Sequence, residues 1–112
     1  MEIHVDVTYD LATDQWTITP DKLPVKEASV IVFHRVPAHA KWTFQHIDGV
    51  PETWKQHFVE GGKKYHVHDP HDETAPTNYQ YVVLVHDEEK DEDHHSPKKK
   101  DRTDPPIIMN EP

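Results

Sequence analysis

The sequence contains no cysteine and no long apolar run. The lack of cysteine excludes disulfides and thiolate chemistry. No apolar segment approaches the roughly 18 residues that a membrane helix needs. The first residues, Met1 to Asp6, have neither the basic region nor the apolar region of a secretory signal. We therefore expect a soluble, cytoplasmic protein that has no membrane partner.

Positive charge is also scarce, because the formal net charge is −9. The basic cluster of Lys98, Lys99, Lys100 and Arg102 follows an acidic run that partly neutralises it. A protein that binds the phosphate backbone needs a clustered basic surface. We therefore expect no nucleic-acid partner.

Hydrophobic residues make up 34% of the 112 residues, which is a low share for a globular protein. A chain of this length forms one domain. Two packed sheets use a thin core better than a helical bundle with wide apolar faces does. The composition therefore favours an all-β fold.

The pattern of the residues agrees with this fold class. Short segments rich in Val, Ile, Thr and aromatic residues alternate with turn residues, and no window keeps a helical period for three turns. Only the segment 51–58 is compatible with a single helical turn. We expect strands over residues 2–9, 15–19, 28–34, 41–47, 64–68, 79–86 and 106–110. About seven such strands predict an antiparallel β-sandwich of immunoglobulin-like architecture.

Residues 87–104 contain no apolar side chain. Such a segment cannot bury enough surface to offset the entropy lost on ordering. We therefore divide the single domain into a β-sandwich body over 1–86, a charged flexible linker over 87–104, and a C-terminal strand over 105–112 that completes the sandwich.

The chain becomes apolar again at Ile107, Ile108 and Met109. Burying a large aliphatic side chain contributes roughly 1.5–3 kcal/mol, so these residues can hold the end of the chain in place. They can dock as an added strand on the same molecule or on a second copy. The expected partner is therefore the protein itself.

The bond between Asp104 and Pro105 precedes this strand. An aspartate carboxylate can attack its own carbonyl carbon, and proline is a good leaving group because its tertiary amide twists easily. A tethered, oriented nucleophile can lower a barrier by about 7–11 kcal/mol. Asp101, Glu111 and a nearby His or Lys are candidate helpers, and the sequence does not choose among them.

The ending Asp104-Pro105 … Glu111-Pro112, behind a pattern of about seven strands, resembles the DP-EP family of small bacterial β-sandwich proteins. The resemblance implies self-cleavage at an Asp-Pro bond, retention of the released peptide, and self-assembly. It assigns Asp104 and Pro105 as the catalytic pair and 105–112 as the retained peptide. No cofactor is expected for this autocatalytic peptidase activity.

Two alternatives stay open. The C-terminal strand can close the sandwich without any chemistry, just as a second Asp-Pro pair, Asp69-Pro70, is expected to be an ordinary turn. Alternatively, the protein can be a non-enzymatic binding or assembly module that holds zinc, nickel or copper. His66 and His68 lie on one face of their strand, and His71 follows shortly after, so these three are the candidate ligands.

Four aromatic residues are candidates for a carbohydrate or peptide platform, although we favour a place in the core for them. They are Trp16, Trp42, Tyr79 and Tyr81.

Overall fold

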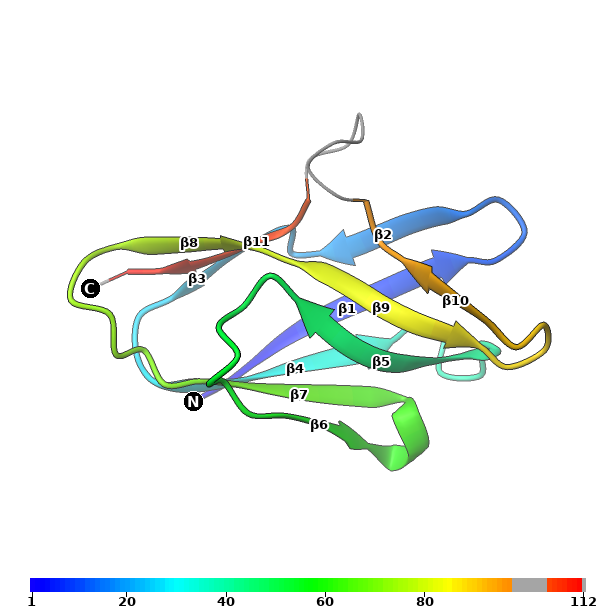
Figure 1. Ribbon diagram of the computed structural model, residues 1–112, viewed down its shortest axis with the longest axis horizontal. Helices are drawn as coiled ribbons and strands as arrows, with labels where there is room; N and C mark the ends of the chain where they lie inside the picture. The colour runs from blue at the N-terminus through cyan, green and yellow to red at the C-terminus, as the bar shows by residue number, and fades with distance from the viewer. Residues whose placement is uncertain (98–104, 112) are drawn as a thin grey trace.

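The computed structural model describes residues 1–97 and 105–111, whereas 98–104 and 112 lie outside the described part. The described residues form eleven strands, one short 3-10 turn (Glu60–Gly62) and no α-helix. The strands are β1 (Glu2–Asp10), β2 (Gln15–Thr19), β3 (Lys22–Val25), β4 (Ser29–Arg35), β5 (Trp42–Asp48), β6 (Gln56–Val59), β7 (Lys64–Asp69), β8 (Thr77–Gln80), β9 (Val82–Asp87), β10 (Glu92–His95) and β11 (Ile107–Asn110) (Figure 1). The all-β class is therefore confirmed.

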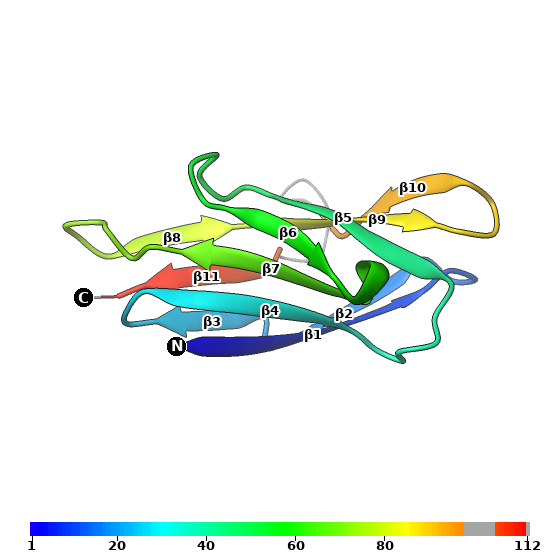
Figure 2. The same cartoon turned by 90° about the horizontal axis from the view of Figure 1, so that it is seen from below.

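The strands form three sheets. A five-stranded sheet with the order β2-β1-β4-β7-β6 makes one layer, and a sheet with the order β10-β9-β5 lies across the core from it (Figure 2). The third sheet has the order β3-β11-β8. In the chain, β3 directly follows β2 of the first layer, and β8 directly precedes β9 of the second layer. β11 pairs with both β3 and β8, so it connects the two layers at this end. The arrangement is sandwich-like.

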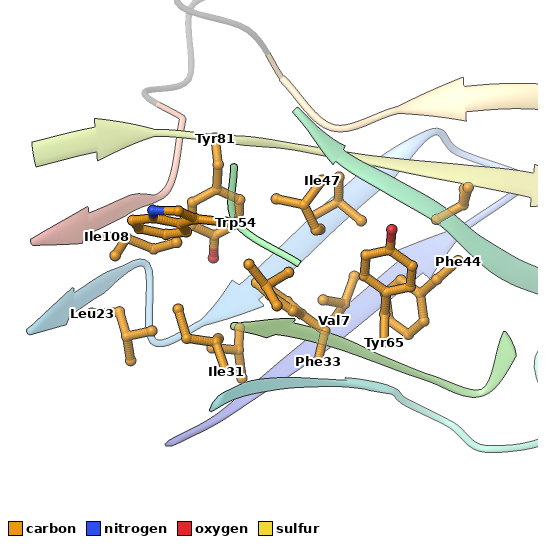
Figure 3. Close-up of a cluster of buried hydrophobic side chains, with 14 of the residues drawn as sticks. Val7, Leu23, Ile31, Phe33, Phe44, Ile47, Trp54, Tyr65, Tyr81 and Ile108 are labelled. Carbon is orange, nitrogen blue, oxygen red and sulfur yellow. The ribbon is translucent and has the colours of Figure 1, made fainter. Parts of the chain in front are cut away.

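Alternating residues of both layers point into one shared core, as the period of two along a strand requires. Phe33 and Tyr65 come from one layer, Phe44 and Ile47 come from the other, and Ile108 comes from the last strand. These side chains are buried together in one cluster (Figure 3). A chain with few apolar residues thus concentrates them between the sheets.

The structure corrects the expected strand count and strand direction. The described residues form eleven strands instead of about seven. The sandwich is not purely antiparallel, because β1 runs parallel to β4 and β3 runs parallel to β11. Short partner strands such as β3 and β6 cannot be recognised from a local pattern when their stability comes from the neighbours they pair with. The immunoglobulin-like connectivity stays a prediction.

Most predicted strands are confirmed with small shifts of their ends. The segment 79–86 is an exception, because it divides at Tyr81 into β8, which pairs with β11, and β9, which pairs with β5 and β10. The segment 51–58 contains a tight turn, in which the Trp54 N–H donates to the Pro51 carbonyl at 3.0 Å, and then enters β6.

The prediction of a flexible linker over 87–104 is wrong for its first part. Asp87 ends β9, and β10 pairs with it in antiparallel register. Ser96 directly follows β10 and is fully buried. Its N–H donates to the Val83 carbonyl at 2.9 Å, while its Oγ accepts from the Val83 N–H at 2.8 Å. Backbone pairing thus orders a segment that has no apolar side chain. The rest of the predicted linker, 98–104, lies outside the described residues.

Candidate functional site

The C-terminal strand β11 is the middle strand of its sheet. It pairs in parallel with β3 and antiparallel with β8, so that Ile108 lies between Leu23 and Tyr79. Backbone bonds extend the pairing beyond both of its ends. The Tyr81 N–H donates to the Pro106 carbonyl at 3.0 Å, and the Glu111 N–H donates to the Val25 carbonyl at 2.8 Å. The strand predicted over 106–110 is therefore confirmed, and it is held on both sides.

One face of β11 points into the protein. Ile108 is fully buried and Asn110 is 2% exposed, whereas Ile107 and Met109 on the other face are partly exposed. Figure 3 shows Ile108 at the end of the core cluster where Trp54 and Leu23 also lie. Ile108 thus packs in the core, and Asn110 contacts a group of polar side chains.

We call this group the C-terminal clamp, and it consists of Asp69, His71, Glu73, Tyr79 and Asn110. The Asn110 Nδ2 group donates to Asp69 Oδ1 and to Glu73 Oε2, both at 2.9 Å. The Tyr79 hydroxyl donates to Glu73 Oε1. The amide of the last strand therefore uses both of its hydrogens to bind carboxylates from the body of the protein.

His71 connects the clamp to the backbone of the last strand. Its Nε2 lies 3.1 Å from the Val25 carbonyl oxygen and 2.5 Å from the Glu111 carbonyl oxygen. Both partners accept, which assigns the hydrogen to Nε2. The backbone N–H of His71 in turn donates to Asp69 Oδ1 at 2.9 Å. His71 therefore ties together the ends of β3 and β11.

The carboxyl groups of the clamp differ in their electrostatics. Burial raises the pKa of the Asp69 carboxyl, which is 1% exposed, although the hydrogen bonds from Asn110 and His71 oppose this effect. Burial also acts to raise the pKa of Glu73, but hydrogen bonds from Tyr79 and Asn110 outweigh it and lower the pKa. Among the described residues, Asp69 Oδ2 and Asn110 Oδ1 have no hydrogen-bond partner. The clamp is thus a partly buried polar network, with Asp69 and Asn110 at its buried centre.

The structure places the predicted cleavage pair only in part. Asp104 and Asp101 lie outside the described residues, whereas Pro105 and Pro106 are buried just before β11. Glu111, a candidate helper, is partly exposed, and its carbonyl oxygen contacts His71. The environment of the Asp104 carboxyl is therefore not part of the described geometry.

The second Asp-Pro pair is more than the ordinary turn that the sequence predicts. Asp69 ends β7 and is buried in the clamp. Sequence reasoning did not find the clamp, since its members come from β7, β8, β11 and the connection between β7 and β8. One local signal was available, because Asn110 is a polar residue at an inward position of an otherwise apolar strand.

The histidines expected to form a metal site are divided by the fold. His66 and His68 lie on the same outer face of β7, as predicted, whereas His71 belongs to the clamp. His57 of β6 lies near the other two instead, because one nitrogen from each of His57, His66 and His68 lies within 4.8 Å of the others. Sequence reasoning missed His57, since the pairing of β6 with β7 is a long-range feature that a single sequence does not display.

The aromatic residues considered as a binding platform belong mainly to the core. Trp42 and Tyr81 are fully buried, and Trp16 and Tyr79 pack against the core from partly buried positions. The preference for a core role is therefore confirmed for Trp42 and Tyr81.

No protein-family model matches this chain, and the search of curated proteins finds no match either. Within the described residues there is no helix with the length and apolar character that crossing a membrane requires. The class of protein that these observations define is an all-β, sandwich-like domain whose last strand is clamped between its two layers.

Proposed function

We propose that this protein cuts its own Asp104-Pro105 bond and keeps residues 105–112 as a bound strand. The observation that carries the proposal is the position of β11, a short segment at the end of the chain that is nevertheless the middle strand of a sheet. The resemblance of Asp104-Pro105 … Glu111-Pro112 to the DP-EP family supports it further.

The chemistry of the cut uses the chain itself. The Asp104 side-chain carboxylate attacks the carbonyl carbon of the same residue and forms a cyclic anhydride. The C–N bond to Pro105 breaks as the proline nitrogen takes a proton. Water then adds to the anhydride, which leaves two carboxyl groups on Asp104. The tethered carboxylate supplies the orientation that contributes about 7–11 kcal/mol in good intramolecular reactions.

Retention of the peptide follows from its contacts. β11 has backbone hydrogen bonds on both sides, and Ile108 is fully buried. The Asn110 side chain donates to Asp69 and Glu73, and the Glu111 carbonyl accepts from His71. None of these contacts needs a covalent bond between Asp104 and Pro105, so the peptide stays in place after the cut.

Self-assembly is the second part of the proposal, and the central position of β11 supports it. After the cut, dissociation of β11 leaves a gap in the middle of its sheet, with unpaired backbone groups on β3 and β8. The same strand of a second copy has the sequence that fills this gap, as in donor-strand exchange. The homo-oligomer and the cytoplasmic location expected from the sequence stay predictions of this proposal.

The two Asp-Pro pairs provide an internal control. The Asp69 carboxylate is held by hydrogen bonds from Asn110 and His71, so it is not free to attack its own carbonyl. Denaturing intact-mass analysis of the purified protein should therefore give pieces 1–104 and 105–112, and no pieces that end at Asp69. Asp104→Asn should stay whole, because an amide is a poor nucleophile.

Cleavage at both Asp-Pro bonds would indicate nonspecific acid hydrolysis and would contradict the proposal. Cleavage of Asp104→Asn at the same rate as wild type would do so as well. The runner-up function is a non-enzymatic binding or assembly module, which the cluster of His57, His66 and His68 favours. That module predicts a chain that remains full-length while it binds its ligand.

A further inference from the structure

The outer face of the five-stranded sheet carries a group of histidines that the proposed self-cleavage does not use. His57 on β6 lies directly opposite His66 on β7, and His68 follows His66 on the same face of that strand. Directly opposed residues of an antiparallel pair share a face of the sheet. The ring centroid of His57 lies 5.0 Å from that of His66 and 5.2 Å from that of His68.

We propose that His57, His66 and His68 bind a divalent late first-row transition cation, such as Zn²⁺, through one imidazole nitrogen each. One nitrogen of each ring lies within 4.8 Å of the other two. At metal–nitrogen distances of about 2.0–2.1 Å, a tetrahedral ion needs nitrogens about 3.3 Å apart. Because none of the three side chains is fully buried, they are free to rotate and bring their nitrogens to this closer spacing.

The chemistry of the ligands selects the kind of ion. Imidazole nitrogens suit zinc, copper and nickel, whereas magnesium and calcium prefer oxygen. Three protein ligands fill three positions of a tetrahedral ion and leave the fourth for water or another small ligand. The site therefore has the donor set of a transition metal with one open position.

The surroundings of His66 disfavour its charged form. Burial, followed by the neighbouring His57 and His68, lowers the pKa of His66. Glu2 on β1 and Lys64 on β7 are the charged groups that act on His66, with opposite signs.

A second pair of histidines on the same face offers a matched control. His4 Nδ1 lies 2.7 Å from His34 Nε2, so these two rings already bond to each other. His4 on β1 and His66 on β7 both pair with Val32 of the intervening strand β4, so His4 lies in the same row as the proposed ligands. His4→Ala therefore removes an imidazole from the same surface without removing a ligand.

The test is calorimetric titration of untagged, chelator-treated, full-length protein with ZnCl₂, with MgCl₂ as the negative probe. We expect a single Zn²⁺ site per chain and no heat with Mg²⁺. His57→Ala and His66→Ala should each weaken Zn²⁺ binding by about tenfold or more, since even changes to the outer partners of metal ligands weaken metal binding by about 10–100-fold. His4→Ala should leave the affinity unchanged.

Cobalt substitution provides a second readout that a general loss of stability would not produce. Co²⁺ bound by three imidazoles in tetrahedral geometry should give visible d–d absorption, and the absorption should disappear in His57→Ala while circular dichroism shows that this variant is folded. Absence of heat with Zn²⁺ would overturn the proposal. Equal weakening by His4→Ala and His57→Ala would overturn it as well, because the binding would then belong to the histidine-rich face as a whole.

Discussion

The burial of Ile108 gives a direct test of how the last strand is held. Its side chain is fully buried, whereas Ile107, the same residue type on the opposite face of β11, is partly exposed. Ile108→Ala removes three carbon groups, which contribute about 0.8 kcal/mol each when buried. Together with the cavity that remains, the expected loss of unfolding free energy is about 2–5 kcal/mol.

The assay is chemical denaturation followed by tryptophan fluorescence, with Asp104→Asn present in every variant so that the chain stays whole. Trp54, which is 4% exposed, lies near Ile108 and reports on this end of the core. Ile107→Ala is the matched control, and its expected loss is about 1 kcal/mol, the typical effect of a point substitution. Equal losses for the two alanine variants would refute the assignment of Ile108 as the anchor of the strand.

Two further predictions concern the clamp and the histidine face. Asn110→Ala leaves the Asp69 and Glu73 carboxyls without their shared donor, so the free energy of unfolding should fall by about 1–3 kcal/mol in chemical denaturation. The control Asn78→Ala, on the exposed part of β8, should have little effect. Similar losses for the two variants would contradict the role of the clamp. Burial, followed by neighbouring histidines and Lys64, lowers the pKa values of His34 and His66 below 6.5. The unfolded chain therefore takes up more protons as the pH falls, and the stability that these groups contribute is present above 6.5 and is lost below it. Denaturation curves between about pH 7.5 and 5.5 should therefore show a smaller loss of stability for His66→Asn than for wild type, and an unchanged pH dependence would contradict this.

The all-β class and most of the strands could be predicted from the sequence, because alternation reports directly on which face of a strand is buried. Val5 and Val7 are fully buried as the pattern of β1 requires. The pattern is less reliable where the backbone is irregular. Strict alternation after Trp42 and Phe44 would place His46 on the buried face. The register of β5 shifts between Phe44 and His46, so Ile47 enters the core and His46 is exposed.

Polar strands were missed for a related reason. β10 consists of Glu92, Asp93, His94 and His95, and its composition is typical of a loop. It is ordered by its pairing with β9 and by side-chain contacts such as His86 Nδ1 with Asp93 Oδ1 at 2.8 Å. A local pattern cannot display a partner that lies elsewhere in the chain.

The candidate sites show the same limit. Spacing along β7 correctly placed His66 and His68 on one face, because that depends only on local geometry. The third histidine depends on which strand lies beside β7, and the sequence order favoured His71 over His57. The clamp likewise brings Asp69 to Asn110 across a long stretch of chain, and no spacing rule predicts that contact.

Mass spectrometry of freshly purified wild-type protein, first under native and then under denaturing conditions, tests the self-cleavage most directly. We predict that native spectra show 1–104 and 105–112 together as one particle, and that denaturing spectra show the two pieces separately. A chain that stays full-length under denaturing conditions, after incubation at mildly acidic and at neutral pH, would contradict the proposed cleavage.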